Sequence, residues 1–307
     1  MLDLFRLQYE GNEVYRNYCN SLGIDSQSVN HESQIPYLPI SAFKYHDVQT
    51  GDFIPEICFY SSGTTNSDQR SKHCIRHLSS YLSHTEKLWN TTFGSVEDYC
   101  FLALLPGYLE REGSSLIAMM HHFIQRSKYT QSGFFLNEFD KLQEVLKYNE
   151  LQNIPTVLFG VSYALLDFCH CLDFKLYNVM VMETGGMKGT REELPKVQLH
   201  KILMDGFGVK RIYSEYGMTE LMSQAYSKGN GLFEPSSTLK VHTCQINDPL
   251  EREMIGKPGI IAICDTANID SACFILTEDI GVMHPSGEFE IVGRLDNSEL
   301  RGCNLLV

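Results

Sequence analysis

A turn rich in hydroxyl groups, Ser61-Ser62-Gly63-Thr64-Thr65, combines the side chains and the backbone freedom that phosphate binding requires. It follows an apolar run, residues 56–60, which predicts a short buried strand. Gly63 lets the backbone approach a ligand closely, and the hydroxyl and successive N–H groups of such a turn can surround phosphate oxygens. Three basic residues follow that could neutralise the bound charge: Arg70, Lys72 and Arg76. The turn is therefore a candidate phosphate loop.

Alternating strands and helices are predicted from this turn to about residue 230. The predicted strands cover residues 99–105, 155–160, 178–183 and 210–215, and the predicted helices cover residues 77–89, 114–126 and 138–148, with two more starting near residues 162 and 191. Such an order is typical of a largely parallel sheet covered by helices. In these sheets ligands bind beyond the carboxyl ends of the strands, where the glycine- and hydroxyl-rich turns of this sequence are expected.

From about residue 232 the pattern changes to short strands with Pro/Gly turns, at residues 259–265, 272–277 and 288–293. We expect an antiparallel β subdomain that closes one side of the site. The predicted fold class is α/β, with residues 1–235 binding the acid and nucleotide and residues 236–307 forming the β subdomain and a hinge-like tail. Near the amino terminus we expect one amphipathic helix, and residues 35–44 are either a connector or an apolar pocket wall.

The composition limits the classes of partner and compartment. The chain has 307 residues, 43% of them hydrophobic, and a formal net charge of −13. This charge argues against nucleic acid or an anionic membrane as the main partner, but a few local basic groups suffice for one nucleotide. Because no signal-peptide pattern and no membrane-spanning apolar run are found, a cytoplasmic location is expected. The ten cysteines are then predicted to be reduced thiols, with Cys58, Cys100, Cys264 and Cys273 as core residues.

The order of residues in the candidate phosphate loop resembles the phosphate loop of the adenylate-forming superfamily, which includes acyl-CoA synthetases, luciferases and adenylation domains. Four further segments resemble that superfamily's motifs in the expected order: Thr184-Gly185-Gly186, Tyr216-Gly217-Met218-Thr219-Glu220, Thr277-Glu278-Asp279 and Gly293-Arg294-Leu295-Asp296. The resemblance covers residues 56–296. It implies the large amino-terminal domain of these enzymes, with ATP and Mg²⁺ as the bound species.

The same resemblance implies a role for each matched residue. The implied nucleotide contacts are Ser61, Ser62, Gly63, Thr64 and Thr65 at phosphate, Gly185 and Gly186 along adenine, Tyr216 and Gly217 at the adenine ring, and Asp279 and Arg294 at the ribose. Thr219 would offer a hydroxyl to phosphate. Glu220 would hold Mg²⁺, which favours carboxylate and phosphate oxygens.

Two departures from the superfamily pattern affect the catalytic cation. The phosphate loop normally continues with Gly-x-Pro-Lys, whereas Asn66-Ser67-Asp68-Gln69-Arg70-Ser71-Lys72 stands here, and Lys72 is the candidate cation. The superfamily also carries a further domain with a catalytic lysine after the hinge, whereas this chain stops eleven residues after Asp296. We expect that domain to be absent, and a nearby Arg or Lys, or a partner, to replace its lysine.

One branch, the acyl-protein synthetases of bacterial luminescence, resembles this sequence in further segments. They are residues 38–44 (LPISAFK), 105–111 (LPGYLER), 183–189 (ETGGMKG) and 293–304. In that branch a cysteine near the carboxyl terminus accepts the acyl group, and Cys303 is the matching residue. The implied function is ATP-dependent activation of a carboxylic acid, of the fatty-acid class, as an acyl-adenylate that a thiol then opens.

The acceptor thiol remains open at this stage between Cys303, CoA, a carrier protein and an acyl reductase. In a first alternative, the protein is a compact acyl- or aryl-CoA ligase of the phenylacetate type, and Cys303 is an inert tail residue. In a second, it is a catalytically silent module that binds the acid or the nucleotide. The alternatives differ in where a thioester forms and in whether acid-dependent pyrophosphate release occurs.

Overall fold

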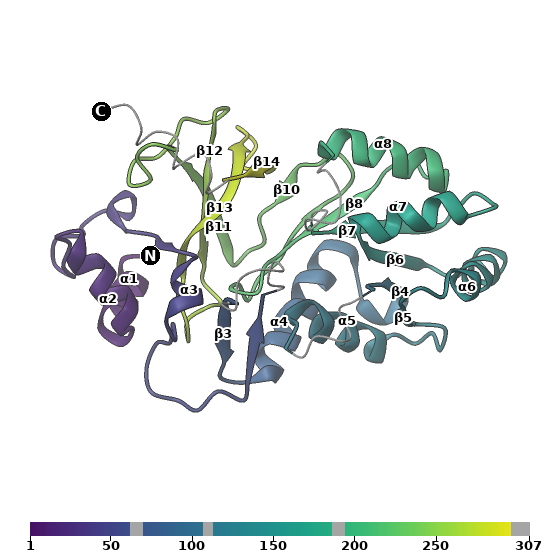
Figure 1. The fold of residues 1–307 in the computed structure, drawn as a ribbon. Helices are drawn as coiled ribbons and strands as arrows, with labels where there is room; N and C mark the ends of the chain where they lie inside the picture. Colours follow the sequence, from purple (N-terminus) through teal and green to yellow (C-terminus); the bar gives the residue numbers. More distant parts are fainter. Residues whose placement is uncertain (62–69, 107–112, 186–193, 296–307) are drawn as a thin grey trace.

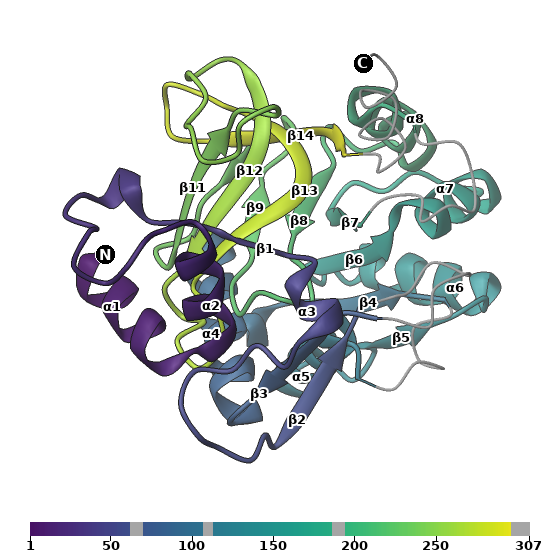
Figure 2. The same ribbon diagram turned by 60° about the vertical axis from the view of Figure 1, so that its left-hand side comes forward.

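One twelve-stranded sheet runs through the protein and supports the elements around it (Figures 1 and 2). The computed structural model describes residues 1–61, 70–106, 113–185 and 194–295. The strand order is β11-β12-β13-β14-β10-β9-β8-β7-β6-β4-β5, and β1 pairs with β13. The predicted α/β class is confirmed.

Five parallel strands form one half of the sheet: β4 (Cys100–Leu104), β5 (Gly133–Phe135), β6 (Thr156–Val161), β7 (Val179–Thr184) and β8 (Tyr213–Tyr216). Every residue of β4 and β6 is buried. Such continuous burial is typical of parallel strands with helices on both faces. The predicted parallel half is therefore confirmed.

Helices cover both faces of this half. α4 (Leu78–Phe93) and α5 (Ser115–Arg126) lie on one face, and α6 (Phe139–Leu151), α7 (Ser162–Cys171) and α8 (Lys196–Phe207) lie on the other (Figure 1). Ser114 caps α5 by accepting a hydrogen bond from the Ile117 N–H, as its residue type predicts. α8 begins after Pro195, and the predicted helix start near residue 191 lies outside the described residues. Within the described ranges, no helix has the length and apolar character needed to cross a bilayer.

The other half of the sheet is antiparallel, as predicted. It consists of β9 (Ala225–Ser227), β10 (Phe233–Glu234), β11 (Leu239–Cys244), β12 (Pro258–Asp265), β13 (Phe274–Met283) and β14 (Phe289–Arg294). It joins the parallel half where β9 pairs with β8. Thr277, Glu278 and Asp279 lie inside β13, not at a strand end as expected, because β13 extends past a register shift against β12. At such an irregularity, neighbouring side chains of β13 need not alternate between the two faces of the sheet.

The amino-terminal segment forms two helices, α1 (Leu2–Gly11) and α2 (Glu13–Ser21), where one was expected. Asn12 separates the two helices because its backbone is extended. Its side chain accepts a hydrogen bond from the Tyr15 N–H and so caps α2. Both helices pack on the antiparallel half, through a core that includes Phe5, Tyr15 and Phe274. A short helix η1 (Glu32–Gln34), β1 (Leu38–Pro39) and α3 (Ala42–Tyr45) follow, and η2 (Val96–Asp98) precedes β4. The division of the chain at residue 235, between the acid- and nucleotide-binding part and the β subdomain, remains a prediction.

The strand before the candidate phosphate loop is not part of the large sheet. β2 (Ile57–Tyr60) pairs with β3 (Lys72–Ile75) in a separate two-stranded antiparallel sheet. Phe59 is buried, but Tyr60 is exposed. The prediction of a buried strand was therefore wrong, because a strand paired on one side by a hairpin partner needs only one buried face.

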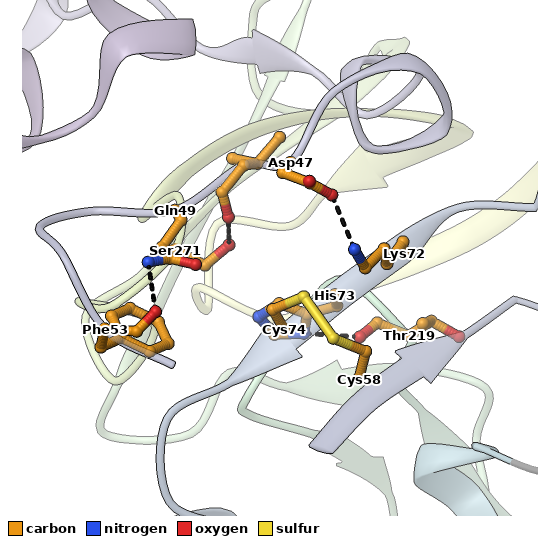
Figure 3. The surroundings of a disulfide bond; sticks show 10 residues. Asp47, Gln49, Phe53, Cys58, Lys72, His73, Cys74, Thr219 and Ser271 are labelled. Carbon is orange, nitrogen blue, oxygen red and sulfur yellow. Dashed lines mark hydrogen bonds and ion pairs between the residues drawn. A yellow bond between two sulfur atoms is a disulfide. The ribbon is translucent and has the colours of Figure 1, made fainter. Parts of the chain in front are cut away.

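The hairpin register places Cys58 directly opposite Cys74, and the two residues form a disulfide (Figure 3). The expectation of reduced thiols throughout, with Cys58 as a core residue, was wrong for this pair. The cause is a cross-strand pairing that brings the two Cα atoms to 4.1 Å, which their sequence separation of 16 does not reveal. Cys100, Cys264 and Cys273 are buried free thiols, as predicted.

We expect thiol titration of the denatured, unreduced protein to give two thiols fewer than the ten cysteines in the sequence. Reduction should lower the free energy of unfolding by up to about 3 kcal/mol, since the bond closes a loop of intermediate length. The measurement is urea unfolding with and without reductant, with a Cys58→Ala/Cys74→Ala variant as the control that reductant should not affect. A full complement of thiols before reduction would contradict the assignment.

Candidate functional site

Tyr216, Asp279 and Arg294 converge where the two halves of the sheet meet. The Tyr216 hydroxyl donates a hydrogen bond to Asp279 Oδ2 at 2.7 Å. Removal of this hydroxyl from water and the adjacent Asp279 carboxylate raise the Tyr216 pKa well above its ordinary value. Asp279 lies opposite Arg294 in the β13–β14 register, and Arg294 Nε is 3.9 Å from Asp279 Oδ1. The structure thus brings together three predicted nucleotide contacts from separate motifs.

Glu220 is a buried carboxylate close to this cluster, with 5% of its surface exposed. Burial raises its pKa, while a hydrogen bond from the Ser71 side chain and the charges of Arg294 and Lys44 act in the opposite direction. Gly217, two residues after Glu215, leaves room for that side chain, because a Cβ at position 217 would collide with the Glu215 carboxylate. Thr219 is half-buried beside Glu220.

The donor chemistry at Glu220 fits Mg²⁺, which commonly takes one or two protein carboxylates and completes its shell with phosphate and water oxygens. Among the described residues, no group of three or more His, Cys, Asp or Glu side chains could hold a metal ion. The assignment of Glu220 as the ligand remains a prediction.

The carboxyl end of β7 is held by a buried polar network. The Ser162 hydroxyl donates to the Gly185 carbonyl at 2.7 Å, and Glu183 Oε2 lies 3.2 Å from the same hydroxyl oxygen. Glu183 also contacts Lys196 Nζ at 2.9 Å and His200 Nε2 at 3.3 Å. Burial alone would raise the pKa of Glu183, but the Lys196 charge and the hydrogen bonds outweigh it and lower this pKa to about 2. The network fixes Gly185, whose φ of +68° suits glycine.

The base of the candidate phosphate loop is closed by Ser61 and Ser71. The Ser61 N–H donates to the Ser71 carbonyl at 3.0 Å, and the Ser71 N–H donates to Ser61 Oγ at 3.0 Å. Arg70 donates to the Ser61 carbonyl. Six predicted site residues lie outside the described residues: Ser62, Gly63, Thr64, Thr65, Gly186 and Cys303.

Residues 35–44 line two hollows, which favours the pocket-wall interpretation over a simple connector. The smaller hollow, about 190 Å³, is bounded by Pro39, Ile40, Thr277, Glu278 and Leu295, among others. The larger, about 570 Å³, lies between α2 and residues 38–47. The smaller one adjoins the Asp279 side of the cluster.

Comparison with known proteins decides the family. The model of the family "Acyl-protein synthetase, LuxE" matches residues 1–307. The chain belongs to this family. A long-chain-fatty-acid–luciferin-component ligase from Aliivibrio fischeri is 22% identical over 349 residues, which cover 99% of this chain and 85% of that protein. Family membership places the chain among the ATP-dependent acid–thiol ligases and confirms the predicted branch.

Solved structures share the fold of this chain. A 2-hydroxyisobutyryl-CoA ligase in complex with 2-HIB-AMP and CoA matches with a TM-score of 0.67 and 13% identity, covering 96% of this chain and 68% of that one. ATP-bound MatB from Rhodopseudomonas palustris matches with a TM-score of 0.58 and 17% identity, over 77% of this chain and 47% of that one. The chain thus spans about half the length of MatB. The predicted adenylate-forming fold is confirmed.

Sequence reasoning missed Lys44. Lys44 Nζ lies 3.9 Å from Glu278 Oε1, and Arg294 contacts the other oxygen of this carboxylate at 3.3 Å. Lys72, the predicted cation, instead forms a 2.9 Å ion pair with Asp47 (Figure 3). Lys44 stands in the segment LPISAFK, which resembles the family, but nothing in the sequence placed its ammonium near Glu278 and Arg294.

The two lysines therefore give different expectations. Lys44→Met should slow adenylate formation by about 10²-fold, the typical loss when a group that stabilises developing charge is removed. Lys72→Met should change it less than about fivefold, because an exposed ion pair contributes at most about 1 kcal/mol. Acid-dependent pyrophosphate release measures both. The reverse ranking would restore Lys72 as the catalytic cation and remove Lys44.

Proposed function

We propose that this acyl-protein synthetase activates a carboxylic acid of the fatty-acid class with ATP and Mg²⁺, and then transfers the acyl group to a thiol, with Cys303 as the acceptor. The observation that carries the proposal is the meeting of Tyr216, Asp279 and Arg294 beside the buried Glu220, in a chain of this family. Tyr216 and Gly185 would border the adenine, and Asp279 and Arg294 would bind the ribose. The proposed location is the cytoplasm.

Adenylation joins two anions, so the site must offset their charge. A carboxylate oxygen attacks the α-phosphorus, the bond to pyrophosphate breaks, and an acyl-adenylate forms. Lys44 and Arg294, both close to Glu278, supply positive charge on this side of the site. Mg²⁺ on Glu220 would neutralise phosphate oxygens when bound. Thr219 and the residues 61–65 would donate hydrogen bonds to the same phosphates.

Thiol transfer completes the reaction. A thiolate attacks the acyl carbonyl, a thioester forms, and AMP leaves with the oxygen that joined it to the acyl group. The Leu295 N–H donates to the Glu278 carbonyl at 2.7 Å, which anchors the chain next to Asp279. Cys303 stands eight residues further along the sequence. Eight extended residues span at most about 26–29 Å, so the thiol can reach the adenylate from this anchor.

CoA is the second candidate acceptor, because a CoA ligase in complex with CoA shares the fold over 96% of this chain. A carrier protein or an acyl reductase would receive the acyl group in a later exchange or directly. A catalytically silent module is the least favoured alternative, since the chain keeps the tyrosine, carboxylate and cation cluster together.

Glu220→Gln tests the activation step. The substitution keeps the size of the side chain but removes the charge that would hold Mg²⁺, so acid-dependent pyrophosphate release should fall by about 10²-fold. Glu144→Gln, at an exposed position of α6, is the matched control and should behave as the wild type. Wild-type rates in a folded Glu220→Gln variant would exclude Glu220 as the metal ligand.

Cys303→Ser tests the acceptor. The variant should form acyl-adenylate at nearly the wild-type rate but lose hydroxylamine-sensitive acyl labelling of the protein, because an oxygen ester is less labile than a thioester. Cys171→Ser, at an exposed free cysteine, should keep the label. Hydroxylamine-sensitive label on the Cys303→Ser variant, or on another cysteine, would remove Cys303 and favour CoA as acceptor.

A further inference from the structure

Two side chains at the start of β3 lie on the same face of the strand, next to the segment that carries Glu220. Ser71 immediately precedes β3, and His73 lies two residues further along; both are buried, with 2% and 1% of their surface exposed. The Ser71 side chain is close enough to the Glu220 carboxylate to lower its pKa. His73 Nδ1 lies 2.8 Å from the Thr219 carbonyl oxygen (Figure 3). Alternate residues of a strand point to the same face, which explains this pairing of contacts.

The hydrogen on His73 can be assigned from its neighbours. Asn268 Nδ2 donates to the Glu220 carbonyl at 2.8 Å and to the Ala272 carbonyl at 2.9 Å. This leaves Asn268 Oδ1 facing His73 Nε2, at 3.0 Å. Both ring nitrogens thus face oxygen acceptors. A backbone carbonyl can only accept, so a hydrogen bond to Thr219 requires the hydrogen of the neutral ring on Nδ1, and we assign it there. Burial lowers the pKa of His73 to about 4, so the neutral ring prevails near pH 7.

Asp265 holds the same segment on its far side. Its Oδ2 accepts from the N–H groups of Met222 and Ser223, both at 2.9 Å. Asp265 and Asn268 are themselves buried, with 0% and 2% of their surface exposed. The backbone of residues 219–223 is therefore bound by three buried side chains from two segments far away in the sequence. Such satisfied buried networks fix one geometry and are costly to open.

We propose that His73 is a positioning residue whose Nδ1–H bond to the Thr219 carbonyl fixes Glu220 relative to β3, the strand that follows the candidate phosphate loop. The inference rests on the proposed function, because the position of Glu220 relative to β3 matters for activity only if Glu220 holds Mg²⁺ at the ATP phosphates. His73 belongs to the strand that ends the loop, and Thr219 precedes the candidate Mg²⁺ ligand. Coupling them through one buried bond would let ATP phosphates meet the loop and the cation together.

The test compares two amides at position 73. His73→Asn places an N–H near the Nδ1 position, whereas His73→Gln places it near Nε2 and leaves the Thr219 carbonyl without a donor. Calorimetry with ATP, with and without Mg²⁺, should show the Mg²⁺-dependent gain in affinity reduced about 5- to 10-fold in the Gln variant, the range for one buried hydrogen bond. The Asn variant should stay within about threefold of the wild type.

Thermal unfolding of both variants and of His242→Gln separates this role from packing. His242 packs edge-on against Tyr37 in the antiparallel half, so its loss should lower stability without altering the Mg²⁺ effect. If His73→Gln does not fold, Asn268→Ala removes the donor to the Glu220 carbonyl and should shift the Mg²⁺ effect in the same direction. Equal losses in the Asn and Gln variants, or an unchanged Mg²⁺ effect in a folded Gln variant, would overturn the proposal. Because calorimetry reports binding alone, absence of acid-dependent pyrophosphate release in the wild type would contradict the proposed function without deciding this one.

Discussion

The hydrogen bond between Tyr216 and Asp279 joins the two halves of the sheet where the predicted nucleotide contacts meet. Tyr216 ends the last parallel strand, and Asp279 comes from an antiparallel strand 63 residues later in the chain. The bond depends on β9 continuing the sheet from β8, so that both halves share one hydrogen-bonded framework. Any rotation of one half against the other would separate the adenine and ribose contacts.

Buried charge is the main cost of this arrangement. Glu183 and Glu220 are almost fully buried, and an unpaired carboxylate in such surroundings would be strongly destabilising. Glu183 is compensated by Lys196 and His200, which lie 2.9 Å and 3.3 Å from its Oε1 and lower its pKa. Glu220 is compensated less well, because Ser71 and more distant charges only partly oppose its burial, and its pKa is raised. A raised pKa is expected of a buried carboxylate whose cation is not bound. Glu183 therefore stabilises the fold, whereas Glu220 is the carboxylate for which we propose a bound cation.

Much of the parallel half could be predicted from sequence because its signals are local. Apolar runs of strand length such as β6, and a cap such as Ser114, depend on residues close together in the chain. The β2–β3 hairpin could not be predicted in the same way, because its separation from the large sheet depends on which strand it pairs with. The Cys58–Cys74 bond follows from that pairing.

The candidate site shows the same division. Tyr216, Glu220, Asp279 and Arg294 could be found because each stands in a recognisable motif. Lys44 and His73 could not, since their importance comes from distances to residues more than a hundred positions away. A half-exposed lysine and a buried histidine have no distinctive sequence context. Only the folded structure places these two side chains next to the motif residues.

Oxygen tracing tests the account most directly. The acid is supplied with ¹⁸O in its carboxylate, together with ATP and Mg²⁺, and the AMP released after thiol transfer is analysed by mass spectrometry. An acyl-adenylate leaves one carboxylate oxygen on the α-phosphorus, so the account predicts one ¹⁸O atom in each AMP formed. Release of AMP without ¹⁸O, or appearance of the label in inorganic phosphate, would contradict it.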